Sequence, residues 1–536
     1  MSENIFQNKL NVYFNNTNSK ELDGLSYSSD SIFLNCRNAG KKLILAKDNF
    51  QAERIYKELK LLSQSRDDDE IIYIPGTEEM PYDMVDSDKF LSSSKNYNLI
   101  EYLNSKKENI SVITTIKNCR KKIIPKNILE NNVIVLNKGS KININEIKDR
   151  FVEIGYINTP QVNFHGEFSI RGSIIDIFPG GYDFPTRIDL DDIDIETMKS
   201  FNTETQITFE GNDKNTIYVA PMNNIILNKD SIINFRKKFR EIFQGNPNNN
   251  NIYTSISNNV IPQGLNNYFP LFYEHTESIL DYFNNIHEIY LFDDIFPILE
   301  DHNKKIKDRF LDCSQNGESF LDPDYLFFND KSLFAKINEK KVFKIYKNKN
   351  LSRDSYNFNI SAVPDISFKP YLDSPISDLK NYIKKMSCVV LCCDEEVKIS
   401  QYTDIFQTHK LAYEIVNKIS DVIFDNQKLY IIHGFINESF RINDLNLSII
   451  NAENIIKNKI KQQSNRNSSK AAFFIDQLKN LELGSPVVHE EHGIGRYGGL
   501  KYLDTNGISN EYLTILYEDN DKLYVPVSAL HLVNKY

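Results

Sequence analysis

The chain has few cysteines, and they do not have the spacing of metal ligands. Six occur among 536 residues, and no CxxC unit is present. A structural zinc site needs four convergent ligands at suitable spacing, so the sequence predicts reduced thiols and no metal site. Cys388, Cys392 and Cys393 stand in the apolar run SCVVLCCD, which predicts a buried strand.

Long apolar runs and an excess of positive charge are also missing. No run approaches the roughly 18 residues of a membrane-spanning helix, and the opening MSENIFQNKLNVYFNN lacks the pattern of a secretory signal. The sequence therefore predicts a cytoplasmic protein with no membrane partner. The formal net charge is −10, from 63 basic and 73 acidic residues. A protein that coats nucleic-acid phosphates is usually basic, so double-stranded DNA is expected only as an indirect or weak partner.

The phosphate loop of a nucleoside triphosphatase, G-x-x-x-x-G-K-[ST], is not found. The nearest approach is Gly40-Lys41, where Asn35 replaces the first glycine and Lys42 replaces the magnesium-binding hydroxyl residue. The earlier segment GLSYSS, residues 24–29, contains no lysine. We therefore expect this chain to hold no cofactor and to have no enzymatic activity of its own.

Short apolar runs that alternate with amphipathic helices make up much of the chain. Ala52, Ile55, Tyr56 and Leu59 recur at helical spacing. Buried strands are predicted at residues 43–46, 71–75, 111–116, 288–294, 388–394 and 428–434. This alternation predicts parallel α/β sheets. From about residue 131, strands separated by Gly/Pro turns predict a mostly β insert with few helices.

The last segment, from about Leu481, again consists of short strands. Gly493, Gly495, Gly498 and Gly499 allow tight curvature, and Asn506-Gly507 is a hairpin signal. These features predict a small β barrel with open edges, and strand addition at an edge is a common way to bind a partner.

This segment reads VVHEEHGIGRYGGL, then EYLTILY, then KLYVPVSALHL. It resembles the RNA-polymerase-interacting domain of transcription-repair-coupling factors and, more loosely, CarD-type regulators. The resemblance implies binding to the β subunit of RNA polymerase. It places Lys501, Tyr502 and Leu503 on the contact strand, with Ile494 and Arg496 nearby. The alternative is that Leu503 only fills the barrel.

The insert carries GEFSIRGSIIDIFPGG and PTRIDLDDIDIETMKSFNTETQIT. These segments resemble a signature that the same factors share with the excision-repair protein UvrB, in which the domain docks onto UvrA. Arg171 and Arg187 match the implied docking arginines, since arginine can pair bidentately with carboxylates. A third position is commonly aromatic in that family and is Asp191 here. The alternative for both arginines is a local salt bridge to a nearby aspartate.

The outer parts resemble the same family more weakly, through IPGTEEMPYD and GLNNYFPLFYEHTESILDYF. The expected fold is a multidomain α/β protein with a degenerate RecA/helicase-like, UvrB-homology module. The expected divisions are lobe 1a without a phosphate loop (1–130), the UvrA-binding β insert (131–218), lobe 1b (219–349), a small α/β domain of unknown role (350–455), a linker (456–475), and an SH3/Tudor-like, CarD-type barrel that binds polymerase (476–536).

The resemblance stops at Tyr536, before the helical connector and two-lobed motor of the family. ATP and magnesium are therefore expected only for a motor that these residues lack. The expected function is that of a monomeric adaptor in transcription-coupled nucleotide excision repair, which binds stalled RNA polymerase and recruits UvrA. The alternatives are the front half of the ATP-dependent DNA translocase itself, or a UvrB-like or CarD-like DNA-binding protein. Both a part of a longer chain and a shortened gene product fit this length.

Overall fold

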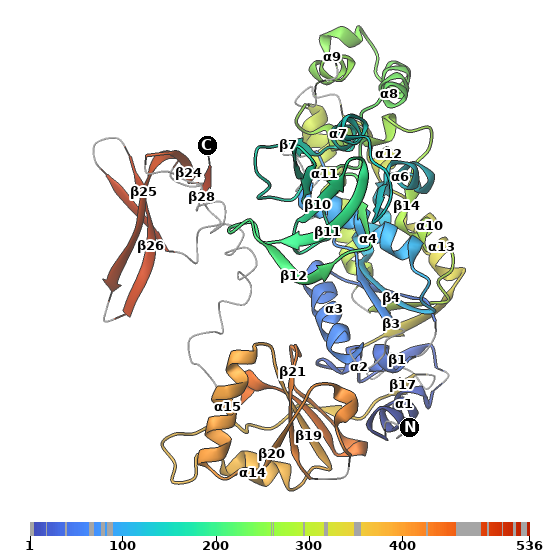
Figure 1. Cartoon of the computed structure of the whole chain (residues 1–536). Helices are drawn as coiled ribbons and strands as arrows, with labels where there is room; N and C mark the ends of the chain where they lie inside the picture. Colours follow the sequence, from blue (N-terminus) through green and yellow to red (C-terminus); the bar gives the residue numbers. More distant parts are fainter. Residues whose placement is uncertain are drawn as a thin grey trace. The chain divides into compact units, whose positions relative to one another are not determined.

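A computed structural model of the chain describes residues 5–17, 19–37, 40–63, 69–76, 81–82, 89–258, 260, 262–292, 295–315, 320–347, 355–424, 427–456, 484–489, 493–505, 508–517, 521–526 and 533–535. The chain divides into two compact units, Met1–Asn454 and Ile455–Tyr536. Each unit is described by itself (Figure 1).

A seven-stranded sheet, parallel throughout, forms the centre of the first unit. Its order is β17 (Tyr356–Asn357), β1 (Glu21–Asp23), β16 (Lys341–Ile345), β15 (Glu288–Phe292), β2 (Lys42–Ala46), β4 (Asn109–Thr115) and β3 (Asp69–Tyr73). The predicted strands at 43–46, 71–75, 111–116 and 288–294 are confirmed, and so is their parallel arrangement. Strands from both sides of the insert therefore share one sheet.

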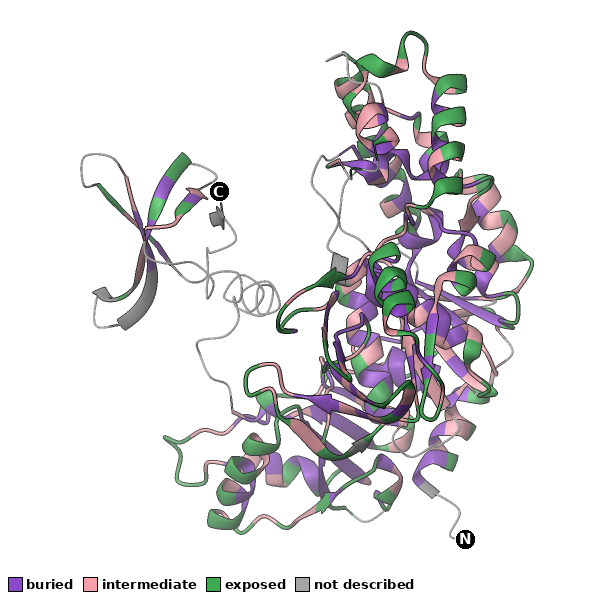
Figure 2. Cartoon of the chain, turned by 45° about the horizontal axis from the view of Figure 1, so that its top comes forward, coloured by how far each residue is buried: buried purple, intermediate pink, exposed green. Residues whose placement is uncertain are grey.

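The helices of this part are α1 (Ile5–Asn15), α2 (Ser29–Cys36), α3 (Asn49–Ser63), α4 (Lys89–Asn104), α5 (Ile116–Arg120), α11 (Ile295–Gln315), α12 (Pro323–Leu326) and α13 (Asp330–Asn338). Between the insert and β15 lie α8 (Lys229–Ile242), α9 (Asn251–Ser257), α10 (Ile279–Tyr282) and the 3-10 helices η1 (Pro247–Asn249) and η2 (Leu265–Leu271). A short ladder pairs β5 (Lys122–Ile123) with β14 (Glu277–Ser278). Figure 2 shows that buried residues concentrate in the strands and on the inner faces of the helices.

The insert is a six-stranded sheet with the order β12-β11-β10-β9-β8-β7. Its strands are β7 (Ile157–Asn158), β8 (Glu167–Arg171), β9 (Ile174–Ile177), β10 (Thr186–Asp191), β11 (Asp194–Phe201) and β12 (Thr208–Asp213). The chain enters after α6 (Lys126–Asn132) through β6 (Ile134–Asn137) and leaves through its antiparallel partner β13 (Thr216–Val219). The predicted β insert is confirmed, and it also contains one helix, α7 (Ile144–Glu153), capped by the side chain of Asn143.

A glycine turn fixes the insert against α4. Gly180 lies so close to Ser93 that a Cβ there would collide with its hydroxyl, and a Cβ on Gly181 would collide with the ring of Tyr97. Gly181 also has a φ of +86°, a conformation that glycine adopts without strain. The rings of Tyr97 and Tyr182 lie 4.9 Å apart beside this turn. The orientation of the insert on the central sheet is therefore set by close backbone contact.

Residues 360–454 complete the first unit with a second α/β sheet, in the order β18-β22-β23-β19-β21-β20. Its strands are β18 (Ile360–Ser361), β19 (Cys388–Cys393), β20 (Tyr413–Val416), β21 (Leu429–His433), β22 (Phe440–Ile442) and β23 (Leu447–Asn451), with α14 (Ser377–Ile383), α15 (Glu396–Thr408), η3 (Ile419–Asp421), η4 (Asn443–Leu445) and η5 (Ala452–Asn454). The strands predicted at 388–394 and 428–434 are confirmed, and the cysteines of β19 are buried thiols.

One hydrophobic core joins this second sheet to α1, α2 and α3. Alternate residues of β19, among them Val390 and Cys392, belong to the same cluster as Phe6 and Phe14 of α1 and Ile55 of α3. Burial of apolar area contributes about 25 cal/mol per Å², so separating the two parts would expose a continuous apolar surface. The second sheet is therefore covered in part by helices α1, α2 and α3.

A buried carboxylate sits at this junction. Glu58 of α3 is 0% exposed, and it accepts hydrogen bonds from Ser28 Oγ at 2.6 Å and from the backbone N–H of Asn437 at 3.0 Å. Its second oxygen accepts from Ser31 Oγ at 2.5 Å and from Arg54 Nη1 at 2.8 Å. These four donors offset part of the cost of burying the charge, while burial raises the pKa of Glu58 above its ordinary value. The carboxylate thus fixes the segment after β21 against the first lobe.

We predict that Glu58→Ala loosens this junction. Removing one member of a buried charge network costs about 3 kcal/mol in the free energy of unfolding, and the amide of Asn437 loses its acceptor. Hydrogen exchange at Asn437 should become at least about tenfold faster. Glu53→Ala is the matched control, because the Glu53 side chain on the same helix is 44% exposed and its pair with Lys57 is worth about 0.5 kcal/mol or less. Equal rates of exchange at the Asn437 amide in both variants would contradict the role of Glu58 at this junction.

The second unit contains a five-stranded sheet with the order β27-β26-β25-β24-β28. Its strands are β24 (Pro486–His489), β25 (Gly493–Thr505), β26 (Ile508–Leu516), β27 (Lys522–Pro526) and β28 (Val533–Lys535). Thr505 pairs with Ile508, as the predicted hairpin requires, although Asn506 and Gly507 lie outside the described residues. Within the described residues no pairing joins β27 to β28, so closure into a barrel stays a prediction. The predicted linker falls almost entirely outside the described residues.

Candidate partner-binding surfaces

Three charged side chains meet on one face of the insert. Antiparallel pairing sets Arg187 of β10 directly opposite Asp176 of β9, and Arg171 stands at the end of the adjoining strand β8. Arg171 Nη2 donates to Asp176 Oδ2 at 2.5 Å. Arg187 donates to the same carboxylate twice, from Nε at 2.8 Å and from Nη2 at 2.9 Å. The structure thus brings together both arginines that sequence reasoning selected.

The two arginines differ in their surroundings. The side chain of Arg187 is 18% exposed, whereas that of Arg171 is 49% exposed and Asp176 is fully buried. Arg187 Nη1 also donates to the carbonyl of Gln206 at 3.1 Å, and its guanidinium lies 4.7 Å from the ring centroid of Phe201. The hydrogen bonds to Asp176 raise the pKa of Arg187. Arg187 is therefore held on several sides, while Arg171 is held at one end only.

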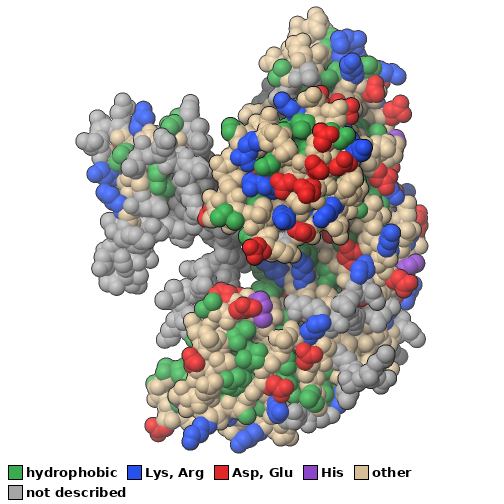
Figure 3. Space-filling model, in the orientation of Figure 1, with side chains coloured by type: hydrophobic (Ala, Val, Ile, Leu, Met, Phe, Trp, Pro, Cys, Tyr) green, Lys and Arg blue, Asp and Glu red, His purple; other side chains and the backbone are tan. Residues whose placement is uncertain are grey.

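Asp191 lies farther along β10, at the turn into β11. It pairs with Asp194 and is exposed, and the intervening Asp192 has a φ of +57°. The position that is commonly aromatic in the implied family therefore carries an exposed carboxylate at a hairpin tip. Figure 3 shows acidic and basic side chains interspersed on the face of the first unit that it presents.

The polymerase-binding residues predicted from the sequence lie on the long strand β25. Ile494 is 59% exposed, and Lys501 and Arg496 are exposed as well, with Arg496 Nη1 donating to the carbonyl of Gly484 at 3.0 Å. Tyr502 and Leu503 pair through their backbones with Glu511 and Asn510 of β26. Their side chains lie outside the described residues, so the contact predicted for them stays a prediction.

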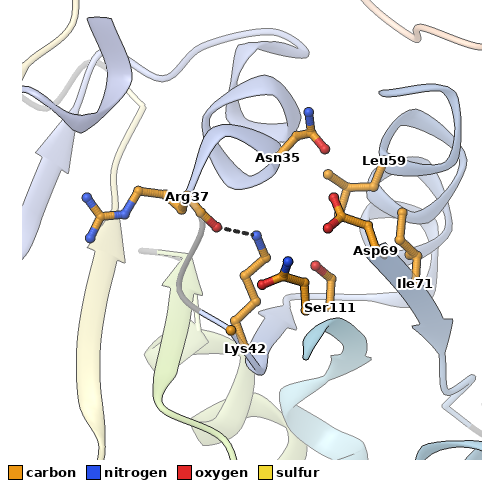
Figure 4. A pocket seen from close by; sticks show the side chains of 9 residues that line it. Asn35, Arg37, Lys42, Leu59, Asp69, Ile71 and Ser111 are labelled. Atoms are coloured by element: carbon orange, nitrogen blue, oxygen red, sulfur yellow. Dashed lines mark hydrogen bonds between the residues drawn. The ribbon is translucent and has the colours of Figure 1, made fainter. Parts of the chain in front are cut away.

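The Gly40-Lys41 segment, which comes nearest to a phosphate loop, lies at the amino end of a strand. A phosphate loop follows a strand and opens a helix, whereas Gly40 and Lys41 immediately precede β2. Lys42 Nζ donates to the carbonyls of Leu34 and, at 2.9 Å, Arg37, at the end of α2. Figure 4 shows this ammonium turned toward Arg37 within a small pocket at the amino ends of β2, β3 and β4. Lys42 thus caps a helix.

The earlier segment GLSYSS does have the order strand, loop, helix, because it links β1 to α2. Two acidic side chains stand beside it. Asp30 is fully buried and accepts hydrogen bonds from both Nη groups of Arg54, at 2.9 and 2.5 Å. Glu58 accepts a hydrogen bond from the hydroxyl of Ser28. Arg54, the cation of this cluster, is already paired with both carboxylates, and acidic groups at a helix N-terminus disfavour a phosphate there. Sequence reasoning missed Asp30, Arg54 and Glu58, although helical spacing places Arg54 and Glu58 on the same face of α3 as Ile55 and Leu59.

A lysine is buried near the carboxyl ends of β3 and β4. Lys95 of α4 is 3% exposed, and its ammonium donates to Asn118 Oδ1 at 3.1 Å. Burial, with the nearby charge of Lys121, lowers the pKa of Lys95 to about 7. Among the described residues it forms no ion pair. Ligands commonly bind at this edge of parallel sheets. Here the side-chain amide of Asn118 already accepts a hydrogen bond from Lys95, so the buried lysine has a structural partner.

We predict that Lys95 makes stability depend on pH. Its folded pKa of about 7 lies below the ordinary lysine value of about 10.4. The unfolded chain therefore binds more protons in this window, and stability rises with pH, by at most about 1.4 kcal/mol per pH unit. Lys95→Met should lose this contribution. Between about pH 7 and 9 the free energy of unfolding of the unmodified chain, measured with denaturant, should therefore rise relative to that of Lys95→Met. Lys117→Met, an exposed neighbour, is the control. Parallel stability curves for Lys95→Met and the unmodified chain would contradict the prediction.

Among the described helices, none has both the length and the apolar character that a membrane crossing requires. Within the described residues, no group of three or more His, Cys, Asp or Glu side chains is placed to hold a metal ion.

Two family models match separate parts of the chain. The model described as UvrB interaction domain matches residues 134–222, which contain the insert with Arg171, Asp176 and Arg187. The model described as CarD-like/TRCF RID domain matches residues 481–536, which contain the five-stranded sheet. The chain is therefore of the class that combines a UvrB-type interaction domain with a CarD-like domain.

Curated relatives match nearly the whole chain. The transcription-repair-coupling factor of Haemophilus influenzae is 28% identical over 93% of this chain and 43% of its own length. Those of Escherichia coli and Staphylococcus aureus are 25% and 24% identical over 93% and 100% of this chain, and 43% and 46% of their own lengths. The chain is homologous to transcription-repair-coupling factors and spans less than half the length of these relatives. The resemblance seen in the sequence is thus confirmed.

Proposed function

We propose that the chain is an adaptor in transcription-coupled nucleotide excision repair. One observation carries this proposal, namely the presence of a UvrB-type interaction domain and a CarD-like domain on one chain that is homologous to transcription-repair-coupling factors. The insert recruits UvrA, and the C-terminal sheet binds the β subunit of a stalled RNA polymerase. The adaptor acts as a monomer in the cytoplasm and meets double-stranded DNA only through its partners.

The insert supports UvrA docking through its arginine cluster. Arg171 presents a half-exposed guanidinium on a rigid sheet, and arginine pairs well with carboxylates on a partner. Asp191 replaces the aromatic contact of the implied family, so docking relies more on the arginines. The acidic tip at Asp191 and Asp192 would also repel an acidic surface, which restricts where the partner carboxylate can lie.

The C-terminal sheet supports polymerase binding through β25. The exposed side chain of Ile494 and the exposed cations Arg496 and Lys501 lie on the strand that the family resemblance assigns to the contact. Leu503 is the proposed apolar centre of this contact. A buried apolar anchor surrounded by polar groups is the usual arrangement of an energetic hot spot.

We predict that the chain binds UvrA and an isolated β-lobe fragment of RNA polymerase at the same time. Leu503→Arg should weaken binding of the fragment about 30-fold or more, because the contact would have to bury a charge. Binding of UvrA should stay unchanged, which shows that the variant is folded. Titration calorimetry measures both affinities.

Tyr524→Arg is the matched control, because Tyr524 is a partly exposed residue of β27, away from the proposed strand. Unchanged fragment binding by Leu503→Arg would reject the polymerase contact. Failure of UvrA to bind the unmodified chain would reject the role of the insert.

The alternative is that these residues belong to the ATP-dependent translocase and take part in ATP turnover. We propose that they do not, since Lys42 caps α2 and the segment after β1 lies beside Asp30 and Glu58. The chain alone should show no ATP hydrolysis above the protein-free background in a phosphate-release assay. ATP hydrolysis by the unmodified chain that is lost in Lys41→Ala would contradict this prediction, because it would show that the Gly40-Lys41 segment binds the nucleotide.

A further inference from the structure

The buried carboxylate of Asp176 has a role that neither family match assigns. It is fully buried on β9, yet it accepts three hydrogen bonds from two arginines of neighbouring strands. Asp176 pairs with both guanidinium groups, and Asp189 adds a second negative charge close to Arg187. Of the two arginines, Arg171 is the more exposed, because Arg187 is mostly covered.

Arg187 is held from three directions. Its Nε and Nη2 groups bind Asp176 in the bidentate geometry that fixes a guanidinium plane. Its Nη1 group binds the carbonyl of Gln206, and the ring of Phe201 lies against the guanidinium. Gln206 has a φ of +59° and its side chain donates to Thr203 and Val162 carbonyls, so the loop that supplies this carbonyl is itself ordered by hydrogen bonds.

Arg171 is held by one contact only. Its Nη2 group binds Asp176 Oδ2, and the same oxygen accepts from Nη2 of Arg187. Among the described residues Arg171 makes no other hydrogen bond or ion pair. The remaining N–H groups of this half-exposed guanidinium are therefore available to a carboxylate of the partner, and the Asp176 contact restricts its rotamers before binding. Restricting a side chain in advance lowers the entropic cost of docking.

We propose that Asp176 is a positioning residue for docking, which fixes Arg187 as an internal support and orients Arg171 toward a carboxylate of UvrA. This inference rests on the proposed function of the insert. It divides the two docking arginines into one that contacts the partner and one that supports the contact. The pairing with both arginines also accounts for the burial of this aspartate.

The first test needs no partner. Nuclear magnetic resonance of the arginine side chains in the whole chain measures how fast the Nε proton of Arg187 exchanges with water. Exchange should be slow in the unmodified chain and about tenfold faster in Asp176→Asn, which cannot accept both donors as a carboxylate does. Equal rates would overturn the proposal, because Asp176 would not hold Arg187. Asp189→Asn is the matched control. Asp189 lies on the same strand as Arg187 and acts on it through charge alone, since among the described residues its carboxylate accepts a hydrogen bond from Thr197 and none from Arg187.

The second test is a double-mutant cycle on UvrA affinity. Asp176→Asn should weaken binding about tenfold in the unmodified background and less than about twofold in the Arg171→Ala background, because Asp176 acts through Arg171. Asp189→Asn should keep full affinity. Equal losses in both backgrounds would show a merely structural effect, and no loss in either would leave Asp176 without a role. Both results would overturn the proposal.

Arg187→Lys tests the same idea if Asp176→Asn is too unstable to fold. Lysine keeps the charge but cannot form the bidentate pair. It should weaken UvrA binding about as much as Asp176→Asn at a temperature well below the unfolding midpoint of the variant, and full affinity would overturn the proposal. Failure of the unmodified chain to bind UvrA would reject the docking function itself, whereas normal binding that is insensitive to both variants would reject only the role of Asp176.

Discussion

The junction around Glu58 is the constraint on which the first unit depends. The apolar core shared by α1, α3 and the second sheet provides most of the attraction, but hydrophobic contact has no direction and permits sliding. The hydrogen bonds of Glu58 to Ser28 and to the amide of Asn437 are directional and allow one arrangement only. Removing any donor would leave a buried charge less compensated, so the packing and the polar network select the same geometry.

This frame gives the insert a fixed base. The seven-stranded sheet carries α4, and the turn at Gly180 and Gly181 packs against α4 so closely that no side chain fits between them. The arginine cluster lies on strands of the insert, not on a loop, so its orientation follows that of the sheet. A docking group held on strands is placed more accurately than one held on a loop. The second unit is a separate compact body with its own small core.

Much of this architecture was predictable from local sequence. Buried apolar runs such as 43–46 and 388–394 located the strands, because a strand buried on both faces leaves a continuous apolar signal. Strand β1 was missed, since three residues with one leucine carry no such signal. Helix α7 was missed within a β-rich region, although Ile147, Phe151 and Ile154 recur at helical spacing. The Glu58 junction depends on contacts between segments almost 400 residues apart, which one sequence does not encode in any local pattern.

In the arginine cluster, too, some residues could be recognised from a local motif, whereas their partner depends on how distant segments pair. Sequence reasoning found Arg171 and Arg187 and set two interpretations against each other, a local salt bridge and a docking contact. It did not identify Asp176, because choosing among the many aspartates requires the register between β9 and β10. That register shows that the two interpretations are compatible. A buried carboxylate that accepts from both arginines saturates the covered one and leaves the exposed one partly free. In the function that we propose, the local salt bridge holds Arg171 in place for docking, since an exposed arginine on a flexible side chain would lose more entropy on binding.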